Sequence, residues 1–194
     1  MARVKILDNN AADATALTAV EDVCTTLAMV GVDYERWDLS RVSETAPAED
    51  VLVAYRDEIE RMKQLGGYTT ADVIDVTPDT PGLDAMLARF DKEHTHAEDE
   101  VRFILCGRGI FFLHVGDHPV VSVEVTAGDW IRIPRGTRHW FTLCSERQIR
   151  AIRWFQQTSG WTPEYTGSGV DQGYEPLCFG PAFLGQRATV SIDL

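Results

Sequence analysis

The chain has 194 residues, of which 44% are hydrophobic and 25% charged, as in an ordinary soluble globular protein. Its formal net charge is -12, and no basic stripe interrupts the acidic balance. This argues against binding to nucleic acid or to an anionic membrane surface, because both need clustered lysine and arginine. The length suits one domain with a sizeable core, so we expect residues 1–194 to form a single domain.

The first ninety residues are expected to be largely helical. Residues 4–6 suggest a short opening strand, and apolar residues then recur at helical spacing over 17–27. A second helix is predicted from Pro47, a residue favoured in the first turn, to the glycines at 66–67. A turn-rich connector leads to a short helix over 83–89.

After this point the sequence changes to short runs that are rich in β-branched and aromatic residues. Turn residues separate these runs, which span 101–106, 109–115, 120–125, 130–133, 139–144 and 149–155. Many short strands at regular spacing indicate an antiparallel sandwich or barrel. We therefore expect a barrel core over 91–156, with the helices packed outside it and a C-terminal extension over 157–194.

Targeting and redox signals are weak. The N-terminus has too few apolar residues for a signal peptide, and no stretch approaches the length of a membrane span. The cysteines are scattered and form no CxxC pair, at Cys24, Cys106, Cys144 and Cys178. We expect them to be reduced thiols, buried as small hydrophobic side chains, in a cytoplasmic protein.

The most informative pattern is His94-x-His96-x3-Glu100, followed by a distant His139. Imidazole and carboxylate together suit Fe(II), Ni(II), Mn(II) or Zn(II). Alternate residues of a strand share one face, so one extended strand could point both histidines, Glu100 and Arg102 inward. Parity alone does not exclude Glu98, and a bend near Ala97 would break this alternation. Four protein ligands leave two positions on an octahedral ion for a chelating substrate, whereas closed structural sites favour cysteine. Unrelated histidines are the alternative, and the pattern as a whole favours a metal site.

Other polar residues near this pattern have less specific interpretations. His114 is expected to be an ordinary strand residue and His118 a turn residue. Glu93, Glu98 and Asp99 could accept hydrogen bonds from the ligand imidazoles. For Glu98 and Asp99, however, a solvated position is the favoured interpretation.

Two segments carry a family resemblance. Residues 94–107, with the pattern HxHx3Ex6G, resemble the first motif of the cupin superfamily, and residues 128–139, with Gx5PxGx2H, resemble the second. The second motif usually ends in asparagine, where this chain has Leu143. The resemblance implies a mainly β fold, the cupin double-stranded β-helix or jelly-roll barrel.

Within the cupins, the chain resembles the bacterial acireductone dioxygenases. The similar segments include 93–102, 107–111 and 134–141, with further likeness at 31–37, Tyr55, 68–74 and 160–167. The resemblance covers most of residues 1–167. Residues 168–194, including the apolar run 179–183, have no counterpart.

This resemblance implies an enzyme of methionine salvage that cleaves 1,2-dihydroxy-3-keto-5-methylthiopentene with O2. The substrate would bind as a dianion through two oxygens. Iron would give 2-keto-4-methylthiobutyrate and formate, and nickel would give methylthiopropionate, formate and CO. The implied cofactor is one Fe(2+) or Ni(2+) per chain, held by His94, His96, Glu100 and His139. The resemblance also suggests a monomer.

The remaining site residues have structural alternatives. Arg102 is the expected catalytic residue, because it would offset negative charge on the bound enediolate, but it could equally be a structural ion-pair partner. Phe90, Phe141 and Trp161 are expected to line the pocket for the methylthio tail, with ordinary barrel core as the alternative. Trp140 is adjacent to His139 in the same strand, so its side chain is expected on the opposite face, away from the pocket, as a packing residue.

Two other functions stay open at this point. One is a cupin oxygenase or isomerase with the same ligands and a different small oxygenated substrate. The other is a non-catalytic cupin that binds a metal or a ligand, for which zinc in a site closed to substrate would be the support. Arg102 at inward parity argues against the non-catalytic alternative.

Overall fold

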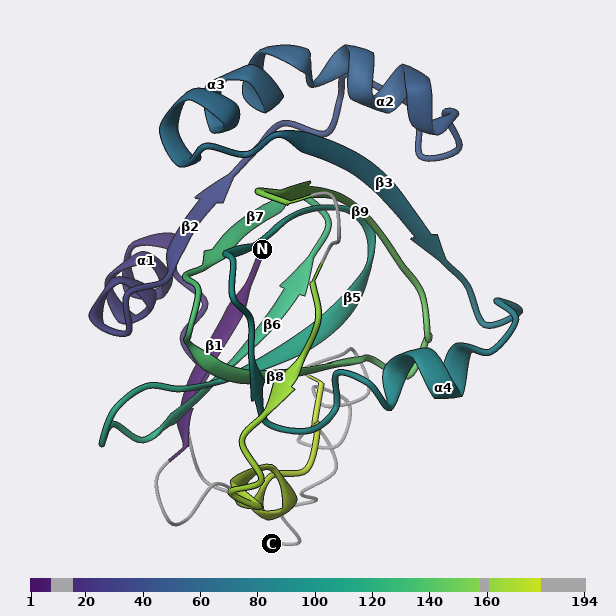
Figure 1. Ribbon diagram of the computed structural model, residues 1–194. Helices are drawn as coiled ribbons and strands as arrows, with labels where there is room; N and C mark the ends of the chain where they lie inside the picture. Colours follow the sequence, from purple (N-terminus) through teal and green to yellow (C-terminus); the bar gives the residue numbers. More distant parts are fainter. Residues whose placement is uncertain (8–15, 158–160, 179–194) are drawn as a thin grey trace, which may run out of the picture.

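The computed structural model describes residues 1–7, 16–157 and 161–178, and it consists mainly of antiparallel strands (Figure 1). The strands are β1 (Arg3–Leu7), β2 (Asp33–Arg36), β3 (Thr70–Val76), β4 (His94–Thr95), β5 (Glu100–His114), β6 (Val120–Thr126), β7 (Asp129–Ile133), β8 (Arg138–Leu143), β9 (Ile149–Phe155) and β10 (Glu164–Tyr165). The helices are α1 (Val20–Met29), α2 (Ala48–Ala54), α3 (Arg56–Gly66) and α4 (Leu83–Leu87), with a 3-10 turn, η2, at Val170–Gly173.

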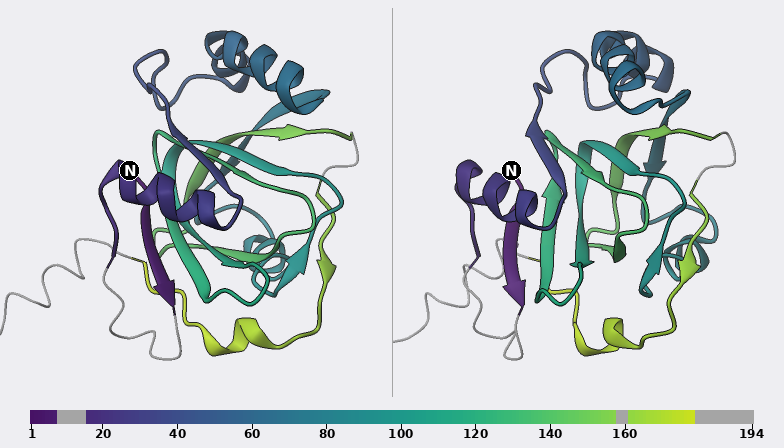
Figure 2. Two further views of the ribbon diagram at one scale, coloured as in Figure 1. Left: turned by 90° about the vertical axis from the view of Figure 1, so that its left-hand side faces the viewer. Right: turned by 60° about the vertical axis from the view of Figure 1, so that its left-hand side comes forward.

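The long strand β5 organises the sheet topology. Its first part pairs with β7 and β9, and its second part pairs with β6 and β8. Two sheets therefore share β5, with the orders β2-β7-β5-β9-β3 and β1-β6-β5-β8-β4-β10. In Figures 1 and 2 these strands curl around a common interior. Among the described residues the pairing follows an open path, and the predicted mainly β architecture is confirmed.

The helices lie outside the strands, as expected. Figure 2 shows α1 against the outer side of the sheet and the α2–α3 pair beyond β3. The α2–α3 pair covers an aromatic-rich face, because its buried Tyr55 and Ile59 belong to one cluster with Phe103 and Trp154. Burial of such large side chains is the main stabilising contribution here. None of the helices in the described part of the chain combines the length and the apolarity needed to cross a membrane.

The N-terminal part differs from the expectation in two ways. It contains the strands β2 and β3, which extend the sheet by pairing with β7 and β9. Their sequences, DYER and TADVIDV, mix polar and apolar residues, and their exposed residues do not alternate regularly with buried ones, so they lack a continuous apolar signal. The expected second helix is also divided at Tyr55, where φ is -104°.

The cysteine prediction is wrong for two residues. Cys144, which follows β8, forms a disulfide with Cys178, and their Cα atoms are 5.8 Å apart. Cys24 and Cys106 are free thiols and are only half-buried. The bond ties the segment after β10 to the barrel. No spacing motif in the sequence indicates this disulfide, because its two cysteines are 34 residues apart.

Candidate metal centre

The four predicted ligands come from three places in the fold. His94 lies in β4 and pairs in register with His139 of β8, while Glu100 opens β5. The chain bends at residues 97–98, between His96 and Glu100, so the alternative of a bend near Ala97 is confirmed and no single extended strand runs through both residues. The four side chains nevertheless converge: they are all buried, and one ligand atom from each lies within 4.8 Å of the others.

Backbone carbonyls set the orientation of the three imidazole rings. Each ring places Nδ1 within 2.6–3.0 Å of a carbonyl oxygen, in the pairs His94–Lys92, His139–Thr137 and His96–Thr162. A carbonyl oxygen can only accept, so Nδ1 carries the hydrogen and Nε2 of each neutral ring has a free lone pair. The expected acidic partners for these rings are therefore replaced by main-chain groups.

The free lone pairs face each other and a carboxylate. His139 Nε2 is 3.0 Å from Glu100 Oε2, and His96 Nε2 is 3.3 Å from the same oxygen. The Nε2 atoms of His94 and His96 are buried without a hydrogen-bond partner. Buried acceptors in such an arrangement are costly unless a cation lies between them. The donor set of three nitrogens and one carboxylate therefore fits a divalent transition-metal ion.

The charge states of two of the four ligands, His94 and Glu100, agree with this fit, whereas the neighbouring Glu100, acting against burial, raises the pKa of His96. Burial, followed by the charge of His139, lowers the pKa of His94 to about 4, so this ring is neutral near pH 7. Burial acts against ionisation of Glu100, but the charge of Arg102 holds the pKa of Glu100 well below its usual range. Metal ligands need these deprotonated forms.

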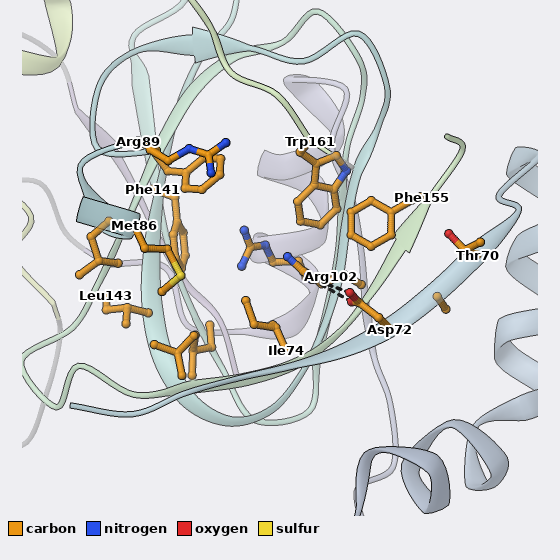
Figure 3. Close-up of a pocket in the computed structure, with 16 residues that line it drawn as sticks. Thr70, Asp72, Ile74, Met86, Arg89, Arg102, Phe141, Leu143, Phe155 and Trp161 are labelled. Atoms are coloured by element: carbon orange, nitrogen blue, oxygen red, sulfur yellow. Dashed lines mark hydrogen bonds and ion pairs between the residues drawn. The ribbon is translucent and has the colours of Figure 1, made fainter. Parts of the chain in front are cut away.

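Arg102 connects the cluster to an adjacent cavity. Its Nε donates to Glu100 Oε1 at 2.7 Å, and the residue is only 6% exposed. The guanidinium carbon lies 4.8 Å from the ring centroid of Phe141 and 5.1 Å from that of Trp161. These contacts hold a fixed positive charge at the cavity wall. Arg102 is thus both an ion-pair partner and a cavity residue (Figure 3).

The cavity has a volume of about 500 Å³, and its lining is mixed aromatic, aliphatic and charged. Phe90, Phe141 and Trp161 all contribute to it. The Phe90 ring centroid is 5.8 Å from that of His94, so the cavity adjoins the ligand cluster. Trp140 instead stacks on another aromatic ring at 5.0 Å, away from the cavity lining, as expected for a packing residue.

A glycine allows one wall of the cavity to form. A Cβ atom at Gly109 would lie 2.3 Å from Cζ of Phe141, which is closer than van der Waals contact permits. Gly109 therefore lets the Phe141 ring lie directly against β5. The backbone N–H of Phe141 donates to the carbonyl of Phe90 at 2.7 Å, which ties the two aromatic residues together.

Glu93 has a role that the sequence did not reveal. It is 1% exposed and accepts hydrogen bonds from Ser168 Oγ and His114 Nδ1, each at 2.5 Å, and from Thr166. It therefore holds the segment after β10 beside His94 and does not contact a ligand ring. His114 lies in β5 as expected, and it also binds the buried carboxylate of Glu93.

Glu98 and Asp99 were expected in solvent, and this expectation is wrong. Both are buried, at 5% and 7% exposure. Glu98 accepts from the backbone N–H groups of residues 156 and 157, and Asp99 accepts from Tyr68 Oη at 2.8 Å and from the Arg135 N–H at 2.9 Å. These bonds fix the turn between His96 and Glu100. Nothing in the local sequence distinguishes them from surface acids.

The chain has close counterparts among known proteins. A family model described as the ARD/ARD' family matches residues 4–163. An acireductone dioxygenase of Stutzerimonas stutzeri is 48% identical over 162 residues, which cover 83% of this chain and 89% of the relative. An acireductone dioxygenase of a Synechococcus strain is 40% identical over 156 residues, covering 80% and 86%.

A solved structure agrees with these relatives. The acireductone dioxygenase from Bacillus anthracis, which has a cadmium ion in its active centre, superposes with a TM-score of 0.78. It is 36% identical, and the match covers 85% of this chain and 98% of that one. The resemblance expected from the sequence is confirmed. On the family match and the identity of these relatives, this chain belongs to the ARD/ARD' family.

Proposed function

We propose that this chain, an acireductone dioxygenase by family, binds one Fe(2+) or Ni(2+) through His94, His96, Glu100 and His139. The observation that carries the proposal is the convergence of three buried imidazole Nε2 lone pairs on one carboxylate, beside a cavity. A divalent ion would satisfy all four groups at once. Two remaining octahedral positions suit a substrate that chelates through two oxygens.

The substrate proposed for the cavity is 1,2-dihydroxy-3-keto-5-methylthiopentene, bound as its enediolate dianion. When bound, the metal ion supplies Lewis-acid and template chemistry. Arg102 lies next to the ligand cluster. Its guanidinium would therefore offset the negative charge of the enediolate and the further negative charge that develops during oxidation. The surrounding aromatic rings of Phe141 and Trp161 limit water around this charge pair.

The apolar part of the cavity suits the other end of this substrate. Phe90, Phe141, Met86 and Leu143 line it, and a methylthio tail gains from burial against such side chains. The charged and apolar ends of the substrate therefore match two regions of one cavity. O2 would be the second substrate, and cleavage of the bond between the enediol carbons would shorten the carbon chain of the substrate.

The identity of the metal decides the products within this proposal. The iron form would yield 2-keto-4-methylthiobutyrate and formate, and the nickel form methylthiopropionate, formate and CO. Nitrogen and carboxylate ligands accept both ions, so occupancy follows availability in the cell. We also propose that residues 1–194 form a single domain and that the protein acts as a cytoplasmic monomer.

The test is reconstitution of the metal-free protein with Fe(II), followed by addition of the acireductone under oxygen. We expect rapid loss of the enediol absorbance, with formate and the 2-keto acid as products. His139→Ala should lose bound iron and turnover. His118→Ala is the matched control, because this histidine is exposed and lies outside the cluster. Iron bound at the cluster without acireductone consumption would instead indicate a cupin enzyme with another substrate.

A further inference from the structure

The charged side chains of the cavity differ in their pairing. The lining contains Asp72, Arg89, Arg102 and Arg153 (Figure 3). Arg153 forms a two-point ion pair with Asp72, with N–O distances of 2.9 and 2.6 Å. Arg102 donates to Glu100. Within the ranges that the structure describes, no carboxylate lies within ion-pair distance of Arg89. Arg89 is thus the cavity cation whose charge no neighbouring acid offsets there.

Arg89 lies at the accessible edge of the cavity. It follows α4, and its side chain is exposed. In Figure 3 its guanidinium points from the α4 side toward the interior, across the cavity from Asp72. Its backbone is held, since its carbonyl accepts from Tyr165 Oη at 3.1 Å and its N–H donates to Met86 at 3.3 Å. The anchored backbone keeps a movable positive group at the entrance.

The distance from this group to the ligand cluster is comparable to the length over which salt screens charges. The guanidinium carbon of Arg89 is 5.5 Å from the Phe90 ring centroid, and that centroid is 5.8 Å from the His94 ring centroid. These two steps set an upper bound on the separation that is close to one Debye length at ~0.1 M salt, ~10 Å, and well within the Debye length of ~30 Å at ~0.01 M. The charge of Arg89 therefore acts on an anion in the cavity at low salt, and added salt will weaken its effect.

An anionic substrate needs such a group in this protein. The formal net charge is -12, so the molecule as a whole repels an enediolate dianion. We infer that Arg89 is a capture residue, whose guanidinium draws the enediolate into the cavity without taking part in the chemical step. This inference rests on the proposed function. It assigns Arg89 to substrate entry and Arg102 to charge stabilisation at the metal centre.

The alternative is that Arg89 only packs on Phe90. A packing role depends on the shape of the side chain and is insensitive to salt, whereas capture depends on its charge. The variants Arg89→Gln, Arg89→Lys and Arg89→Glu separate these effects, because lysine keeps the charge and glutamine keeps much of the length. Arg56→Gln is the matched control: Arg56 is exposed at the start of α3, outside the cavity lining, and its loss changes the net charge equally.

The experiment measures kcat and kcat/KM of the iron-loaded proteins at ~20 mM and at ~0.5 M salt. At low salt we expect Arg89→Gln to lower kcat/KM about three- to tenfold, with kcat changed less than about twofold. Arg89→Glu should lower it further, Arg89→Lys should retain most of it, and Arg56→Gln should match the wild type. At high salt the difference between Arg89→Gln and wild type should shrink.

The results that overturn the inference are equally specific. An unchanged kcat/KM in Arg89→Gln would do so, as would an equal loss in Arg89→Lys or a loss that salt leaves untouched. These outcomes leave the proposed function standing, because the wild type remains active in each. An inactive wild type with iron bound would instead overturn both.

Discussion

Replacing Arg102 by alanine should remove most turnover while the metal stays bound. Arg102 is 6% exposed, and its Nε donates a hydrogen bond to Glu100 at 2.7 Å. The aromatic rings of Phe141 and Trp161 also contact the guanidinium group and hold it in place. A positive group fixed in this way needs no reorganisation when negative charge develops on the substrate. Removal of one such preorganised donor typically lowers kcat by about 10²–10³-fold.

The same substitution should affect stability differently with and without metal. Without metal, the buried Glu100 loses the partner that holds its pKa low, and breaking a buried ion pair from one side costs about 3–5 kcal/mol. With metal bound, the ion itself offsets the carboxylate charge. For a protein of this size, ~1 kcal/mol corresponds to roughly 2–4 °C in Tm. We therefore expect a clear fall in Tm for the metal-free variant and a smaller one for the loaded variant.

The assay combines three measurements: bound iron per chain, kcat for acireductone loss, and Tm with and without metal. Arg102→Lys is the informative companion, because it keeps the charge and loses the planar fork. It should retain iron and show an intermediate kcat. Wild-type turnover by Arg102→Ala with iron bound would refute the catalytic role, and equal Tm losses in both forms would refute the charge argument.

Three further predictions concern the scaffold. Asp129 is fully buried and accepts hydrogen bonds from several donors, so Asp129→Asn should cost about 2–4 kcal/mol in urea unfolding; an unchanged midpoint would contradict this. Cys178→Ser opens a loop of 34 residues to Cys144, and the chain-entropy model gives a loss of up to about 4 kcal/mol. Reductant should lower the Tm of the wild type similarly and leave that of the variant unaffected. Gly109→Ala would push against Phe141 and should raise KM more than it lowers kcat, whereas unchanged kinetics would show that the ring can move freely.

Local patterns predicted the β-rich barrel and its outer helices well. Runs rich in β-branched and aromatic residues mark strands that are buried on both faces, and these runs correspond to β5 through β9. The strands β2 and β3 were not predicted, because they are short or partly polar and their exposed residues follow no regular alternation. Their pairing with β7 and β9, which are distant in sequence, stabilises them.

The candidate site was predictable at the level of residue types. The spacing of His94, His96 and Glu100 with a later His139 is rare enough to indicate a metal site. Parity alone could not decide between one straight strand and a bend near Ala97, and the chain does bend between His96 and Glu100. The four ligand atoms nevertheless converge. The pairing of β4 with β8 places His94 beside His139, and the hydrogen bonds of Asp99 fix the turn that leads to Glu100.

The sequence by itself therefore determined the chemistry available to this protein: its ligand types, its family and the strand-forming segments of its barrel. These depend on residue identity and on spacing over a few positions, which a chain displays without folding. Only the tertiary structure decided which acids are buried, that Cys144 meets Cys178, and that Arg89 forms no ion pair with a described residue. Burial, cross-linking and charge pairing arise between segments far apart in sequence, so they exist only after the chain has brought those segments together.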